Sequence, residues 1–240
     1  MNPNSKPEKR FRLLREIVET LALALLLFLV IRFAVQNFAV DGTSMEPGLH
    51  NSESILVDKW TYLFHPPERG DVIVFVAPPQ PDVDYVKRVV GIPGDVITIH
   101  DTTVIVDGVA LNETYIAPQN QGIPPEAHTI TNLVVPANEY FVLGDNRAIS
   151  SDSRVWGLLP KANIIGRAAF VYWPLGRDND GFLKNYASVF ANVHQPGSTA
   201  LHWPANTPGI PDADSLLLIF FPGVSLFFLR KKQRQQLIAR

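Results

Sequence analysis

The most apolar part of the chain lies near its start, where the eleven residues LALALLLFLVI occupy positions 21–31. The wider stretch 17–35 is interrupted only by Glu19, Thr20 and Arg32, which all lie near its ends. At about 1.5 Å per residue, a helix of this length covers roughly the 30 Å hydrocarbon core of a bilayer. The pattern therefore predicts a transmembrane helix, which we place at residues 16–36.

Basic residues flank this predicted helix unevenly. Five of them precede it, whereas the next basic residue after Arg32 is Lys59; the five are Lys6, Lys9, Arg10, Arg12 and Arg15. The positive-inside rule then predicts a cytosolic basic tail at residues 1–15 and places the rest of the chain outside the cytosol. A cleaved signal peptide has a similar start, but the following FAVQNFAVDG lacks a clean A-x-A site, which favours an uncleaved anchor.

A second apolar run, SLLLIFFPGVSLFFL, occupies residues 215–229 and is followed by Arg230, Lys231, Lys232 and Arg234. Fifteen residues are short for a span, and Pro222-Gly223 would kink a helix. A second crossing, which would put these basic residues in the cytosol, and a re-entrant or surface-lying segment both fit the pattern. We predict a hydrophobic helix here, within a hydrophobic segment with a basic tail at 215–240, after a linker at 191–214.

Between the two apolar runs, short segments rich in β-branched residues alternate with turn residues. Runs at 54–58, 69–78, 138–143 and 164–173 each predict a strand, and the alternation V-I-T-I-H then T-V-I-V-D predicts a hairpin near 96–111. We find no ten-residue helical pattern between residues 41 and 172. The fold class is therefore predicted to be mainly β, with an antiparallel sheet domain at 37–190 on the N-terminal helix.

The composition excludes several kinds of chemistry. The 240 residues are 46% hydrophobic and 18% charged, which is enough for a core, and the net charge of −2 gives no reason to expect nucleic acid as a partner. The chain has no cysteine, so disulfides, thiolate catalysis and cysteine-bound zinc are excluded. None of the six histidines has the spacing of a zinc site, and we expect neither a metal nor another cofactor.

A serine and a lysine in unusual settings could act together. Ser44 lies in VDGTSMEPGL, just after the predicted anchor, and Lys87 lies in YVKRVVGIPGD among valines. If Lys87 points inward, burial could lower its pKa by roughly three units, at a cost of about 4 kcal/mol, and the neutral amine could take the Ser44 proton. Taken alone, Ser44 also fits a turn or a helix N-cap, and Lys87 fits a lysine whose amine reaches water.

The segment GDNRAISSDSRVWG, at residues 144–157, alternates acidic, basic and hydroxyl groups between apolar strands. Such a segment fits a solvated loop, and it also fits a buried polar network whose members satisfy one another.

These phrases together resemble bacterial type I signal peptidases, the leader peptidase family. The resemblance runs from residue 15 to about 173 and includes the anchor leading into DGTSMEPGL, then RGDVIVF, DYVKRVVGIPGD and GDNRAISSDSR in order. It implies a serine endopeptidase in the plasma (inner) membrane, with its catalytic domain outside the cytosol. Its partners would be membrane lipid and secretory preproteins, whose N-terminal signal peptides it would remove by cutting after small residues at −1 and −3.

The resemblance also implies roles for individual residues. Ser44 would be the nucleophile and Lys87 the general base of a Ser-Lys dyad. Ser150 would help to orient the lysine. Asp152 and Arg154 would form a supporting ion pair, which Asp145 would join.

The resemblance assigns no definite role to two positions near the nucleophile, Gly42 and Met45. Gly42 stands where some family members carry a hydroxyl that helps to hold the oxyanion, so we expect an oxyanion hole that relies on the Ser44 backbone N–H or on water. Met45 either lines the substrate groove near the small-residue pocket or packs in the core. A further departure is Ile149, where the family pattern often has a polar residue.

Two other functions stay open. One is a specialised Ser-Lys processing protease with a dedicated substrate, and the other is an inactive membrane-tethered β binding module. The presence of both Ser44 and Lys87 argues against the inactive module.

Overall fold

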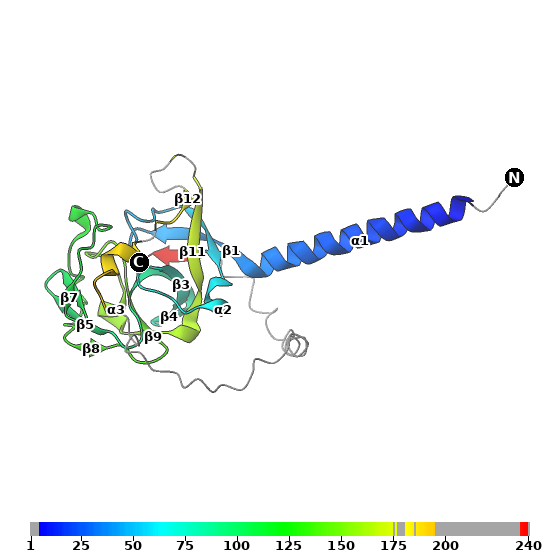
Figure 1. The fold of residues 1–240 in the computed structure, drawn as a ribbon. Helices are drawn as coiled ribbons and strands as arrows, with labels where there is room; N and C mark the ends of the chain where they lie inside the picture. The colour runs from blue at the N-terminus through cyan, green and yellow to red at the C-terminus, as the bar shows by residue number, and fades with distance from the viewer. Residues whose placement is uncertain (1–4, 175, 177–180, 185, 195–235, 240) are drawn as a thin grey trace, which may run out of the picture.

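In the computed structural model, a long helix near the start of the chain leads into a β domain, from which it projects (Figure 1). The structure describes residues 5–174, 176, 181–184, 186–194 and 236–239. Helix α1 spans Ser5–Ala34, and its segment Phe11–Ala34 is long and apolar enough to cross a membrane. No residue of that apolar segment is buried in the protein, so lipid is the environment that suits these side chains.

Strand β1, Val35–Gly42, begins where α1 ends. Phe38 and Val40 are buried while Asn37, Ala39 and Asp41 are exposed, which is the alternation of a strand with one covered face. The predicted anchor, placed at 16–36, takes in the first two residues of this strand, and no strand was predicted for the rest.

A nine-stranded sheet contains β1 and eight further strands. These are β2 Ser54–Asp58, β3 Val72–Ala77, β4 Gln80–Gly91, β9 Glu139–Leu143, β10 Leu159–Pro160, β11 Ile164–Trp173, β12 Gly181–Phe182 and β13 Gln236–Ala239. All described pairings are antiparallel except those of β13, which runs parallel to both β1 and β4. The pairings run from β3 through β4, β13, β1, β2 and β11 and back to β3, which makes a closed barrel-like circuit.

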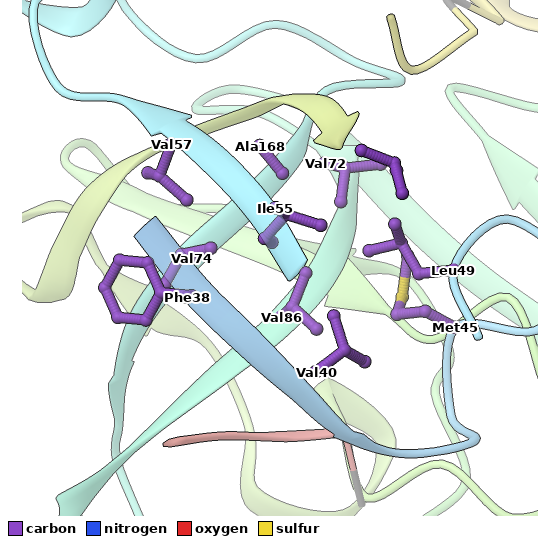
Figure 2. Packing of buried hydrophobic residues seen from close by; sticks show 11 residues of the cluster. Phe38, Val40, Met45, Leu49, Ile55, Val57, Val72, Val74, Val86 and Ala168 are labelled. Atoms are coloured by element: carbon purple, nitrogen blue, oxygen red, sulfur yellow. The ribbon is translucent and has the colours of Figure 1, made fainter. Parts of the chain in front are cut away.

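The core of this circuit holds side chains from five strands and from the turn after β1. Figure 2 shows the side chains of these strands pointing toward one another, with Met45 and Leu49 of the turn packed against them. The cluster consists of Phe38, Val40, Met45, Leu49, Ile55, Val57, Val72, Val74, Val86, Ala168 and Val171. Because Met45 and Leu49 are fully buried here, the turn that carries Ser44 is fixed to the barrel.

A smaller four-stranded sheet lies between β4 and β9 in the sequence. Its strands, β5 Val96–His100, β6 Thr103–Val106, β7 Val109–Ala110 and β8 Leu133–Val134, pair in the order β7-β6-β5-β8. The antiparallel register of β5 and β6 confirms the predicted hairpin. The remaining elements are short: α2 Thr61–Phe64, α3 Ser153–Trp156, η1 Pro118–Asn120, η2 Lys161–Asn163 and η3 Ala187–Phe190.

The prediction of a mainly antiparallel β domain with a long apolar N-terminal helix is confirmed. The hydrophobic helix predicted at 215–229 lies outside the described residues, as does most of the predicted linker. Within the predicted segment 215–240, the described part is strand β13.

Candidate active site

Ser44 lies in the turn that follows β1. This turn begins at Gly42, whose φ of 108° lies in a region that glycine adopts without strain. The Gly42 N–H donates to Asn51 Oδ1 at 2.9 Å, and the Ser44 carbonyl accepts the Asn146 N–H at 2.9 Å. Ser44 is fully buried. Its backbone is therefore held by the segment 144–157 that the sequence analysis singled out.

Lys87 lies on β4 with a fully buried side chain. Successive strand residues point to opposite faces, so Lys87 shares a face with Tyr85 and not with Val86, which faces the barrel core. Its Nζ lies 5.4 Å from the centroid of the Tyr85 ring. Nζ donates to Ser44 Oγ at 2.5 Å, although the two residues are 43 positions apart in the sequence. The fold thus brings together the two residues predicted to form a dyad.

The surroundings of Lys87 favour its uncharged form. Burial lowers the pKa of Lys87 to about 7, against the opposing charges of Asp152 and Asp145 and with a smaller contribution from Arg154 in the same direction. With this pKa, about nine-tenths of the amine is neutral at pH 8. The alternative that Lys87 reaches water from a strand edge does not fit this geometry.

Asp152 and Arg154 form a buried ion pair beside the dyad. Asp152 is the N-cap of α3 and accepts from Arg154 Nε at 2.9 Å and Nη2 at 2.8 Å, and from the Gly144 N–H at 3.1 Å. Burial alone would raise the pKa of Asp152, but these bonds, the charge of Arg154 and the Ser150 hydroxyl lower it. The carboxylate is therefore charged, and Arg154 offsets part of its effect on Lys87.

Asp145 pairs with a different arginine from the one expected. Its two oxygens accept from Arg88 Nε at 2.8 Å and Nη2 at 2.7 Å, so it does not join the Asp152–Arg154 pair as predicted. Arg88 also donates to the Gly70 carbonyl at 2.8 Å, and its guanidinium lies 4.5 Å from the centroid of the Tyr115 ring. Arg88 lies opposite Leu143 in the β4–β9 ladder, which brings it next to Asp145, and its planar guanidinium then binds both carboxylate oxygens.

Gly144 and Ser150 lie directly against the nucleophile. A Cβ at Gly144 would lie 2.6 Å from the Ser44 carbonyl oxygen and would also overlap Ser150, so the backbone packs here only because residue 144 is glycine. Ser150 is fully buried, and its Oγ makes no hydrogen bond by strict geometry within the described residues. It is nevertheless close enough to Asp152 to help lower the pKa of that residue.

Met45 serves the core and also borders a small cavity. It is fully buried in the barrel cluster, and it lines a cavity of about 140 Å³ together with Leu49, Val72, Arg88 and Tyr115. Ile149 is exposed. Among the residues that the structure describes, no three His, Asp or Glu side chains are placed to share a metal ion.

Sequence reasoning missed Arg88 and Gly144. The signal for Arg88 was that it follows Lys87 within a run of valines, where a buried strand has no water for a guanidinium to reach. A buried arginine needs a carboxylate, and Asp145 is an acidic residue at the end of another strand. For Gly144 the sequence shows only a glycine before an aspartate, which is equally typical of an ordinary turn.

Several known proteins are similar to this chain over more than two thirds of its length. The profile of the family described as "Signal peptidase, peptidase S26" matches residues 14–173. A protein of Synechocystis sp., "Probable signal peptidase I-1", is 36% identical over 182 residues, which cover 72% of this chain and 90% of the relative. "Signal peptidase I" of Leptolyngbya laminosa is 38% identical over 173 residues, 68% of this chain and 82% of the relative. "Signal peptidase IB" of Staphylococcus aureus is 34% identical over 183 residues, 71% of this chain and 94% of the relative.

Proposed function

Because the chain belongs to the peptidase S26 family of signal peptidases, it is a serine peptidase that cleaves signal peptides, and we propose that Ser44 and Lys87 carry out the reaction. The observation that supports this assignment best is the buried 2.5 Å contact between Ser44 Oγ and Lys87 Nζ. A nucleophile and a base within hydrogen-bond reach, with the base largely uncharged near neutral pH, are what attack on a peptide carbonyl requires.

The proposed reaction has two halves. With the amine neutral, the Ser44 hydroxyl donates to Lys87 Nζ and transfers its proton as Oγ attacks the scissile carbonyl. The resulting ammonium then protonates the leaving amine, which departs as the N-terminus of the mature protein. In the second half, neutral Lys87 takes a proton from water, and the hydroxide attacks the acyl-enzyme. As the acyl–oxygen bond breaks, the Lys87 ammonium returns this proton to Ser44 Oγ, which releases the signal peptide and restores the neutral amine.

The developing oxyanion needs donors that are already in place. We assign the first of these to the Ser44 backbone N–H. Gly42 has no side chain to contribute, and its own N–H is bonded to Asn51. The hole therefore relies on backbone N–H or on water.

The neighbouring charged residues affect the position and the protonation of Lys87. We assign to Asp152 and Ser150 the positioning of the amine, and to Arg154 the neutralisation of a carboxylate that would otherwise keep Lys87 protonated. The Arg88–Asp145 pair fixes the backbone on both sides of the site, because Arg88 follows Lys87 and Asp145 precedes Asn146, which holds the Ser44 carbonyl.

For the membrane we propose that α1 anchors the enzyme with its N-terminus in the cytosol and the peptidase domain outside the plasma (inner) membrane. The uneven basic residues support this orientation. The Lys59 N–H donates to the carbonyl of Ala34, the last residue of the helix, and the exposed side chains of Trp60, Leu63 and Phe64 follow directly. Aromatic residues are favoured at the membrane–water interface, so this end of the domain faces the lipid.

Cleavage-site mapping tests the proposed specificity. The full chain in membrane vesicles, given a secretory preprotein, should release a mature protein with a single new N-terminus, which mass spectrometry identifies. We expect small residues at −1 and −3 of the cut. Cuts after large residues would contradict this specificity, and cleavage of one dedicated substrate alone would favour the specialised protease. The absence of any cleavage would favour the inactive binding module.

The activity should depend on pH through Lys87. Because the neutral amine is the reactive form and its pKa is about 7, kcat/KM should rise about tenfold per pH unit below pH 7 and level off above it. The measurement is kcat/KM from pH 5.5 to 9 with a peptide that lacks histidine, so that the substrate itself does not titrate. A flat profile between pH 6 and 8, or a rate that falls with rising pH, would exclude Lys87 as a base with this pKa.

A further inference from the structure

The barrel contains a slot between β1 and β4 that leads to the active site. On one edge β1 pairs with β2 through residues 35–39, and on the other edge its residues 39–42 pair with β13. Strand β4 pairs with β3 on one side. On its other side, β4 pairs with β9 only from Arg88 onward. Without β13, the edge of β1 at residues 39–42 and the edge of β4 at Asp84 and Tyr85 would face each other with no strand between them.

Strand β13, Gln236–Ala239, fills this slot in register with both edges (Figure 1). Ala239 lies level with Gly42, two residues before Ser44, and Ile238 lies level with Tyr85, two residues before Lys87. The three strands are parallel, so the segment runs toward the dyad along the direction in which β1 and β4 reach it. An extended peptide that adds a strand to exposed edges is a common mode of peptide recognition.

We propose that Gln236–Ala239 is a built-in occupant of the peptide-binding slot, which holds the enzyme in a self-occupied state until the extended segment of a preprotein displaces it. This inference rests on the proposed function, because it takes the slot beside Ser44 and Lys87 as the place where substrate binds. The occupant is part of the same chain, so its effective concentration at the slot does not fall on dilution, and weak strand pairing is enough to compete with substrate.

The proposal also bears on the membrane topology of the tail. Strands β1 and β4 belong to the domain that follows α1, and β13 pairs with both. A single crossing of the membrane by residues 215–229 would put Gln236–Ala239 on the opposite side from these strands. The self-occupied state therefore requires that Gln236–Ala239 lies on the same side of the membrane as these strands.

Kinetics of a strand-breaking variant test the competition. Ile238→Pro removes a backbone N–H of β13 and should release this segment from the slot. If the segment occupies the slot nine-tenths of the time, its release lowers the apparent KM about tenfold and leaves kcat unchanged. Gln233→Pro, outside the strand, is the matched control and should behave as the unsubstituted enzyme. A KM lowered less than about twofold by Ile238→Pro would overturn the proposal.

A crosslink tests the placement without catalysis. The chain has no cysteine, so Asp41→Cys with Ile238→Cys introduces one pair at positions that the register places opposite each other. Neighbouring strands lie about 4.8 Å apart, within the Cα separation of a disulfide. In a Ser44→Ala background, this pair should oxidise readily in vesicles, and an excess of uncleaved signal-sequence peptide should suppress the crosslink.

The control pair combines Ile238→Cys with Asp101→Cys, an exposed site in the turn between β5 and β6, and should not crosslink. No disulfide in the first pair, equal disulfide in both, or no effect of the peptide would overturn the proposal. The crosslink needs no turnover. The absence of preprotein cleavage by the unsubstituted enzyme would therefore refute the proposed function, while the crosslink would still show whether Gln236–Ala239 lies beside β1.

Discussion

Ser44→Ala and Lys87→Ala are each expected to lower kcat for signal-peptide cleavage by at least about 10⁴-fold. The first removes the attacking oxygen. The second removes the amine that accepts the hydroxyl proton, whose Nζ lies 2.5 Å from Ser44 Oγ. Because the two act as one unit, the double variant should be hardly slower than either single variant. The measurement is single-turnover cleavage of a preprotein by the full chain in vesicles.

Matched controls separate chemistry from folding. Ser151→Ala and Lys161→Ala remove the same kinds of group near the site and at the surface, and both should retain nearly full activity. Lys87→Met replaces a buried, largely neutral amine with an apolar side chain of similar length, so it should be inactive yet at least as stable as the unsubstituted enzyme. More than about 1% of activity remaining in Ser44→Ala or Lys87→Ala would contradict the assigned dyad.

The strands that the sequence could predict are those bounded by turn residues. Ser54–Asp58 and Ile164–Trp173 have the predicted bounds, because apolar residues, several of them β-branched or aromatic, dominate them and turn residues lie close by. Strand β1 was not predicted, because its first residues, Val35 and Gln36, were assigned to the anchor. Strand β13 lies beside a basic cluster, and its parallel pairing with β1 and β4 connects residues far apart in the chain, which no local pattern reveals.

The candidate site was predictable as a set of residues but not as an arrangement. A resemblance to a family supplied Ser44 and Lys87, whereas their local patterns alone favoured a turn serine and a solvent-reaching lysine. The burial of Lys87 does not fit a lysine that reaches water, and this burial depends on what packs against β4 from β3 and β9. The partner of Asp145 was mispredicted for a similar reason, because the pairing joins residues 57 positions apart through the β4–β9 ladder.

Asp145→Asn is expected to reduce the free energy of unfolding by about 3–5 kcal/mol. The Arg88 side chain is only 2% exposed, so removing the carboxylate charge leaves a guanidinium with no water to replace its partner. The aromatic rings of Tyr115 and Tyr186 and the Gly70 carbonyl remain, but they compensate only in part. Urea denaturation of the full chain in detergent, followed by tryptophan fluorescence, measures the loss.

Asp101→Asn is the matched control, because it makes the same chemical change at a highly exposed carboxylate and should change the free energy of unfolding by less than about 0.5 kcal/mol. Replacing both partners, as Arg88→Met with Asp145→Leu, should restore much of the stability. Replacing a whole buried ion pair with apolar residues leaves no unpaired charge, whereas removing one partner does. Asp145→Asn should also shift the pH midpoint of kcat/KM downward, because the Asp145 charge raises the pKa of Lys87. A loss of under about 1 kcal/mol with an unmoved midpoint would show that the Arg88–Asp145 pair supports neither the barrel nor the lysine.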